Sequence, residues 1–217
     1  MTSVALSVPE RTPLELLRTI ASKPSTHARF LNTVSMLEYI GARKIMKSQQ
    51  ADEMDMELLT HVSEESRHAW LVKRLAWQLD RESTRTYAPE CLLCGAEGEA
   101  YIQELDAAVK EELAGCGVEG DSPQSSGWLN YLYTSLLIEE RAEHFYADYA
   151  VVLQEHKLGG ALKALIKDET KHLIQMARRI KEVDPRGEER LSRLRVVEKR
   201  GFQAFEDALW EQLEEAA

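Results

Sequence analysis

The sequence is poor in the residues that interrupt helices: its 217 residues include only 11 glycines and 6 prolines. Chains built from short strands and tight turns use many of both residues. Glu, Ala, Leu, Lys and Arg dominate instead, and all five have a high helix propensity. The composition therefore disfavours an all-β fold and favours an all-α one.

Long hydrophobic runs and an excess of basic residues are also missing. The longest mostly apolar run, residues 131–138, is interrupted by Thr134 and Ser135, whereas a membrane span needs about 20 apolar residues. The first residues lack the basic and apolar segments of a signal peptide, so we expect a soluble, cytoplasmic protein. The net charge of −10 disfavours nucleic acid as a partner.

Cysteine is scarce: Cys91, Cys94 and Cys116 lie in one stretch, and their odd number fits reduced thiols better than a disulfide framework. Cys91 and Cys94 have the spacing of half a zinc site. With no second cysteine pair and no histidine nearby, the stretch supplies at most three ligands, so we do not expect a structural zinc ion. The pattern assigns Cys91 and Cys94 no role.

Apolar residues recur at helical spacing and predict four long helices, at about 25–48, 52–79, 128–154 and 161–181. A short helix at 14–21 precedes them, and a fifth long helix follows at about 186–215. The segment at about 81–127 is a crossover that contains a short helix near 101–113. We find no repeat, so we expect a single domain over 1–217 with its bundle core at about 25–182.

The second and fourth long helices each carry a Glu-x-x-His motif, Glu65 to His68 and Glu169 to His172. Residues at i and i+3 share one helical face, so each motif can present a carboxylate and an imidazole to one metal ion. These residues interrupt apolar stripes, and a charge buried in this way needs a partner. The motif is short, so the rest of the pattern has to support a metal site.

The first and third long helices each supply a carboxylate within an apolar stripe, Glu38 and Glu140. Helical rise places Glu38 about 15 Å before Ser48 and Glu65 about 16 Å after Met54, so the two share one height. Glu140 agrees poorly with Glu169, at about 21 Å against about 12 Å. Either the third helix ends early or bends, or the ligand is Glu143 or His144.

This order of Glu, Glu-x-x-His, long crossover, Glu and Glu-x-x-His resembles the ferritin-like di-iron carboxylate superfamily. The resemblance covers about residues 25–182. It implies a ferritin-like four-helix bundle with a long crossover between helices 2 and 3 and, in this chain, an extra C-terminal helix.

The resemblance also implies a ligand set. Glu65 and Glu169 would bridge or flank two metal ions, and His68 and His172 would each bind one. Glu38 and Glu140 would be terminal ligands, with Glu140 preferred over Glu139 because it keeps the apolar phase of its helix. Further candidate ligands are His61, Glu143 and His144.

A centre of this kind implies two iron ions, with manganese or a mixed pair as alternatives. The leading hypothesis is an oxidase or oxygenase that activates O2 for attack on a small organic substrate. The chain has no flavin motif and no rubredoxin-like cysteine pairs, so we expect an external electron donor, and a small oligomer such as a homodimer. The alternatives are a ferroxidase or rubrerythrin-like protein that handles iron or peroxide, and a metal-free helical interaction protein.

Overall fold

The structure is a computed structural model that describes residues 11–49, 54–114, 126–156, 158, 160 and 162–215. Within these residues it contains α-helices, one 3-10 turn and no strand, so the all-α prediction is confirmed. The elements are α1 (Pro13–Ala21), α2 (Pro24–Ser48), α3 (Met56–Leu79), η1 (Pro89–Cys91), α4 (Gly95–Ala114), α5 (Ser126–Glu155), α6 (Lys163–Val183) and α7 (Gly187–Glu215). None of the described helices is long and apolar enough to cross a membrane.

Local chemistry sets where several helices begin. The Thr12 hydroxyl accepts a hydrogen bond from the backbone N–H of Glu15, and Pro13 occupies the first turn of α1. The Asp55 carboxylate accepts from the backbone N–H of Leu58 at 2.9 Å and so caps α3. The observed bounds of the long helices lie within about four residues of those that the apolar periodicity predicts.

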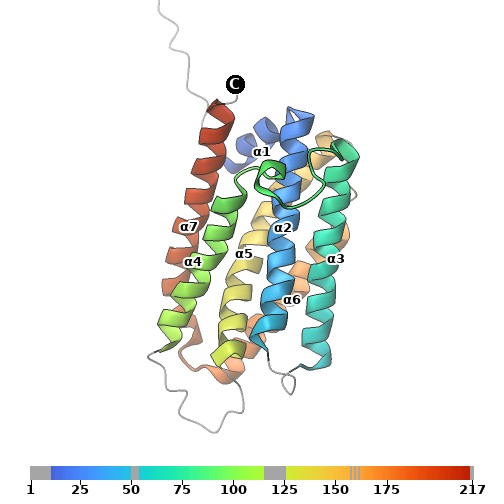
Figure 1. The fold of residues 1–217 in the computed structure, drawn as a ribbon. Coiled ribbons are helices and arrows are strands. Elements are labelled where there is room, and N and C mark those ends of the chain that lie inside the picture. The colour runs from blue at the N-terminus through green and yellow to red at the C-terminus, as the bar shows by residue number, and fades with distance from the viewer. Residues whose placement is uncertain are drawn as a thin grey trace, which may run out of the picture.

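The helices pack in two hairpins with a covering pair (Figure 1). α2 packs along α3 and α5 along α6, while α2 also contacts α5 and α3 also contacts α6. The chain then crosses from α3 to α4, and α4 lies beside α7 against the outer side of α5. As a consequence α5 is surrounded by other helices, whereas α3 and α6 keep an outer face toward solvent.

The apolar core is divided into two clusters along the helices. One holds side chains near α1, and the other lies toward the opposite end of the molecule. Each of the four helices α2, α3, α5 and α6 contributes residues to both clusters, and on each helix a glutamate lies between the residues of one cluster and those of the other. The flanking pairs are Val34 and Ile45, Leu58 and Val72, Leu136 and Tyr146, and Leu165 and Met176. A polar layer is therefore enclosed by apolar side chains on two sides.

The start of the crossover is fastened to α2 by side chains. The Asn32 amide donates to the carbonyl oxygens of Thr86 and Cys91, and the Thr33 hydroxyl donates to that of Leu93 at 2.8 Å. Cys91 and Cys94 are buried free thiols, and burial raises the pKa of Cys94 to about 12. Both are reduced, as the sequence predicts, while Cys116 and the crossover residues 115–125 lie outside the described residues.

Two bidentate ion pairs join α5 to α7. Arg141 binds Glu198 at 2.8 and 2.9 Å, and Glu198, only 6% exposed, also accepts a hydrogen bond from Tyr101. Arg195 binds Glu140 at 2.7 and 2.9 Å, but there the arginine side chain is 40% exposed. The two pairs have the same chemistry in different surroundings.

We therefore expect Arg141→Met to lower the free energy of unfolding by about 3 kcal/mol, because it leaves the buried Glu198 carboxylate without its cation. Arg195→Met, the matched control, should cost at most about 1 kcal/mol because solvent screens Glu140. Urea unfolding followed by circular dichroism measures both values. Equal losses in the two variants would contradict this ranking.

Candidate metal centre

The polar layer between the two apolar clusters is made of four glutamates and three histidines. They come from four helices: Glu38 from α2, His61, Glu65 and His68 from α3, Glu139 from α5, and Glu169 and His172 from α6. All but the partly buried Glu38 are at most 7% exposed. They form two groups, and within each group the donor atoms lie within 4.8 Å of one another.

The first group consists of Glu38, Glu65, His68 and Glu169. His68 Nδ1 lies 2.9 Å from Glu169 Oε1 and 3.6 Å from Glu65 Oε1. The phenol of the buried Tyr146 donates a hydrogen bond to Glu38 Oε1. One imidazole nitrogen and three carboxylates therefore face a common point.

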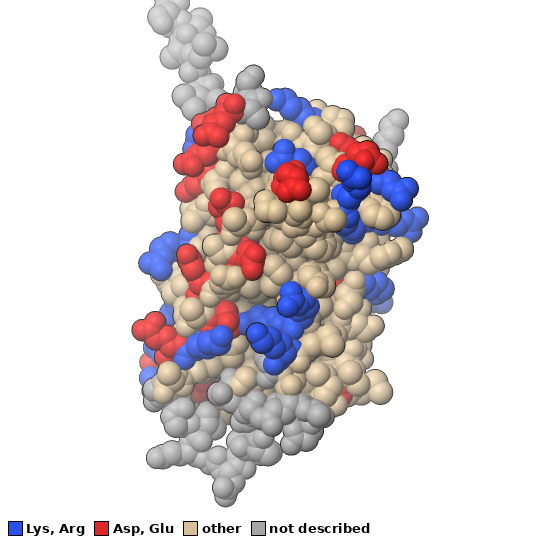
Figure 2. Space-filling model, viewed as in Figure 1, with Lys and Arg blue, Asp and Glu red and all other residues tan. Residues whose placement is uncertain are grey.

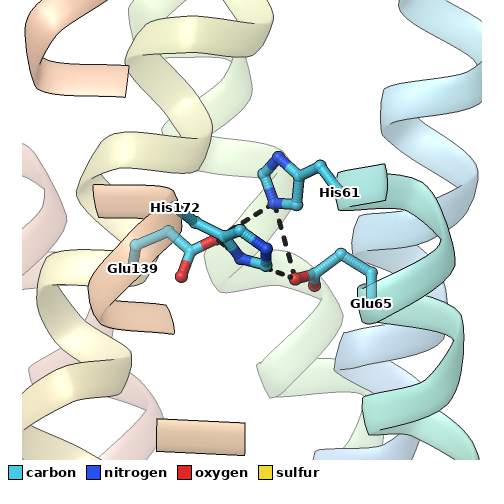
Figure 3. A group of neighbouring side chains, drawn as sticks. All are labelled: His61, Glu65, Glu139 and His172. Carbon is cyan, nitrogen blue, oxygen red and sulfur yellow. Dashed lines mark hydrogen bonds and ion pairs between the residues drawn. The ribbon is translucent and has the colours of Figure 1, made fainter. Parts of the chain in front are cut away.

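The second group consists of His61, Glu65, Glu139 and His172, and thus shares Glu65 with the first. Figure 3 shows His61 and Glu65, one turn apart on α3, facing Glu139 and His172 from the opposite hairpin. His61 Nε2 is 3.2 Å from Glu139 Oε1, and His172 Nδ1 is 3.5 Å from Glu65 Oε1. Here two imidazoles and two carboxylates converge.

Five buried nitrogen and oxygen atoms of this layer, each able to bind a metal ion, have no hydrogen-bond partner among the described residues. They are Glu65 Oε1, His68 Nδ1, Glu139 Oε2, Glu169 Oε1 and His172 Nδ1. Even at 2.9 Å, His68 Nδ1 and Glu169 Oε1 lack the alignment of a hydrogen bond. An unpaired buried polar atom costs about 1–3 kcal/mol. Metal ions would satisfy all five atoms at once, so the residues fit a metal site.

Each imidazole is held at its outer nitrogen. His68 Nε2 lies 3.2 Å from Asp168 Oδ2, and His172 Nε2 lies 2.7 Å from Glu64 Oε2. His61 Nδ1 lies 2.7 Å from the Tyr131 hydroxyl. With a proton on the outer nitrogen, the inner nitrogen keeps its lone pair for a metal, an arrangement that recurs in metal sites.

The outer contacts of His68 and His172 are related by a simple exchange. The acid that precedes the glutamate of one Glu-x-x-His motif holds the histidine of the other motif. Both motifs thus read acid-Glu-x-x-His, with Glu64 in one and Asp168 in the other. The motif search missed these two residues, although the acid at the same position of both motifs is a signal that could have found them.

Burial and mutual repulsion make the carboxylates of the layer hard to ionise. Burial, with the charges of Glu139 and Glu65 nearby, raises the pKa of Glu169 to about 8. Burial likewise raises the pKa of Glu38 and of Glu139. For Glu65, burial would raise the pKa, but the close imidazoles of His61 and His68 outweigh it and hold the pKa well below its usual range.

His68 and His172 hold protons strongly because carboxylates surround them. Burial alone would lower the pKa of His68, but the close carboxylates of Glu169 and Glu65 raise it to about 11. Burial would also lower the pKa of His172, but the close carboxylates of Glu139 and Glu169 raise it to about 11. Without metal, the layer binds protons in place of cations.

Five of the six predicted ligands come together: Glu38, Glu65, His68, Glu169 and His172. The additional candidate His61 joins them. Glu140 does not, because it is paired with Arg195 on the side of α7, and Glu139 takes its place in the layer. The apolar phase of α5, which favoured Glu140, was a poor guide because residues 128–139 of this helix are buried nearly all round, with Leu132, Tyr133, Leu136 and Leu137 all buried.

Glu143 and His144 belong to neither group: Glu143 is half-buried and His144 is exposed. The mismatch in height that suggested them has another cause. α5 continues past the start of α6, and its last turns, with Tyr149 and Leu153, pack against α1 in one of the apolar clusters. The third long helix therefore neither ends early nor shifts its ligand by a turn.

A small recess reaches the second group. It is lined by His61, Tyr131, Leu132, His172 and Met176, among others, and has about 10 Å³ of free space, room for about one water molecule. Arg179 also lines it and forms ion pairs with Asp55 and Glu57. The second group is thus the side of the centre that a small molecule can approach through this recess.

Comparison of the chain with protein-family models, with curated proteins and with solved structures gave no match. The functional argument therefore rests on the geometry of the site.

The pKa shifts predict how the metal-free protein responds to pH. The pKa of Glu169 in the folded protein, about 8, and that of His68, about 11, both lie above the ordinary values of 4.5 and 6.5. The folded state then binds more protons than the unfolded state, so stability falls as pH rises. We expect the melting temperature of the metal-free protein to fall between pH 6.5 and 8, measured by calorimetry.

The metal-free variant Glu169→Gln should show a smaller fall over the same range, because it removes one of the groups that lose protons. Glu143→Gln, outside the layer on α5, should behave like the wild type. A flat profile in the wild type would mean that the layer does not hold protons in this way.

Proposed function

We propose that this layer holds two metal ions and that the protein is a dinuclear metal oxidase or oxygenase. The observation that carries the proposal is the pair of buried four-residue groups that share Glu65 and leave five donor atoms unpaired. A single ion would leave part of each group unsatisfied. Glu38 and His68 would hold one ion, His61, Glu139 and His172 the other, with Glu65 between them.

Glu169 also faces both ions in this proposal. Its Oε1 lies 2.9 Å from His68 Nδ1 and its Oε2 lies 3.9 Å from His172 Nδ1, so its two oxygens point to different groups. Glu65 and Glu169 are therefore the two bridging candidates. Their order in the chain, with α4 inserted between the hairpins, supports a ferritin-like arrangement, to which His61 adds a third imidazole.

Four carboxylates and three imidazoles are ligands that suit iron or manganese. A pair of ferrous ions, when bound, supplies the electrons that reduce O2. The protein's own groups prepare the site: Tyr146 orients Glu38 by donating to it, and Tyr131 fixes His61. Burial raises the pKa of both phenols well above the usual range, so both keep their protons.

The surroundings of the layer favour metal ions that remain bound as a cofactor over metal ions that bind as a substrate and are released. The three histidines are at most 4% exposed, and each is held at its outer nitrogen, so the ligands are fixed in place. A ferroxidase has to release its ferric product, which needs mobile or exposed ligands. The recess beside the second group has apolar walls that include Leu58, Leu132 and Met176, but it has room for only about one water molecule, so an organic substrate would bind there only if the recess widened.

The metal content tests the first part of the proposal. Protein loaded with Fe(II) without oxygen should bind about two ions per chain, measured by atomic emission after desalting. Glu139→Gln should lower the metal content because it removes an inward-facing carboxylate. Glu140→Gln, at the next residue, should leave the metal content unchanged because Glu140 pairs with Arg195 outside the layer. Less than half an ion in the wild type would favour the metal-free interaction protein.

The reaction class is tested by mixing excess Fe(II) with oxygenated protein in a stopped-flow instrument. We expect a single burst of iron oxidation equal to about two ions per chain, because the oxidised ions stay bound. Glu139→Gln should reduce the burst and Glu140→Gln should not. Sustained turnover with formation of a soluble mineral would instead identify a ferroxidase.

A further inference from the structure

The outer face of α3 carries arginine and tryptophan in alternation at Arg67, Trp70, Arg74 and Trp77, and Arg81 follows just past the end of the helix. The spacing of three and four residues returns the four helical side chains to the same face of α3. Trp70 is 59% and Trp77 42% exposed. The Arg74 guanidinium lies 5.5 Å from the Trp70 ring centre, and that of Arg81 lies 4.9 Å from Trp77. We call these five residues the Arg/Trp strip.

The neighbouring helix α6 extends this face with positive charge. Lys163, Lys167 and Lys171 recur every four residues, and all three are exposed. The only acids in residues 63–79 and 163–178 are Glu64, Glu65, Asp168 and Glu169, which contact histidines of the centre. Figure 2 shows basic side chains together with acidic ones near the upper end of α3, and acidic side chains along the upper part of α7. The face is basic on a chain of net charge −10.

Two short chains of contacts connect this face with the centre. Arg67 pairs with Asp168 Oδ2, which lies 3.2 Å from His68 Nε2. Lys171 Nζ lies 3.3 Å from Glu64 Oε2, which lies 2.7 Å from His172 Nε2. On each route a single carboxylate separates an exposed cation from an imidazole of the centre.

We propose that the Arg/Trp strip, with the lysines of α6, docks a small acidic one-electron carrier of the ferredoxin class. This inference rests on the proposed function, in which such a carrier is the electron donor. Each docked carrier gives up one electron, so two dockings convert two Fe(III) ions to two Fe(II) ions while two carriers are each oxidised by one electron. His68 and His172 are the groups of the centre nearest to the docked carrier.

Charge and residue type select this partner over others. Exposed tryptophan and arginine are the residues that most often carry binding energy in protein interfaces. The basic face steers an acidic partner toward the strip, whereas the same face of a second copy would repel it. Burying Trp70 and Trp77 against the carrier removes apolar surface from water and complements the attraction between charges.

The test measures the binding of an acidic [2Fe–2S] ferredoxin to the metal-loaded protein by calorimetry at low salt. Trp70→Ala and Arg74→Glu should each weaken the binding at least tenfold, and added salt should weaken wild-type binding. Both residues are exposed and have no contact with the centre, so metal content and reduction by dithionite should not change. Val196→Ala and Lys199→Glu, which make the same kinds of change at exposed sites on α7, should bind like the wild type.

Unchanged affinity in Trp70→Ala and Arg74→Glu, or no binding by the wild type, would overturn the docking proposal. A dimer that Trp70→Ala dissociates, seen by sedimentation, would assign the strip to a second copy and overturn it too. Failure of the proposed function has a different signature: a chain that binds less than half a metal ion. Strip-dependent binding by such a chain would keep the docking surface while refuting the oxidase.

Discussion

The rest of this structure depends on one electrostatic constraint, the burial of four carboxylates at mid-height in a helical bundle. Water cannot solvate these groups, and like charges so close together cannot all ionise without cations. Burial raises the pKa of Glu169, and the neighbouring carboxylates raise the pKa of His68 and His172. Bound protons therefore neutralise part of the negative charge. Five nitrogen and oxygen atoms of the layer still have no hydrogen-bond partner among the described residues, which supports the proposal that cations complete the site.

The charges around this layer alternate in sign from the centre to the surface. The inner carboxylates contact His68 and His172, these histidines contact Asp168 and Glu64, and those acids pair with Arg67 and Lys171. Each shell offsets the one inside it, so the acidic centre requires a basic surface directly above it. The basic face of α3 and α6 is thus linked to the site by the same chain of contacts that holds the ligands in place.

The sequence predicted the helices and most of the layer because both follow from periodicity. Glu38, Glu65 and Glu169 interrupt apolar stripes on helices with one buried face, and such a stripe can be identified from the sequence alone. α5 lacks such a stripe because α4 and α7 cover its other side, so the apolar phase that favoured Glu140 over Glu139 was a poor guide, and the structure places Glu139 in the layer instead. The choice of His61 over His144 likewise depended on the rotation of each helix, and the reaction stays a prediction.

The two groups are chemically unequal, and this inequality bears on how such a site would work. The group with Glu38 has one imidazole and three carboxylates, and the group with Glu139 has two of each. The recess opens onto the nitrogen-rich group, at His61 and His172, while Tyr146 and the apolar core close the other. Carboxylates can change their mode of binding, whereas an imidazole held at its outer nitrogen cannot move far. A water-sized molecule that enters by the recess would therefore meet the more rigid half of the centre, and the adaptable carboxylates of the other half would adjust to changes in metal charge away from it.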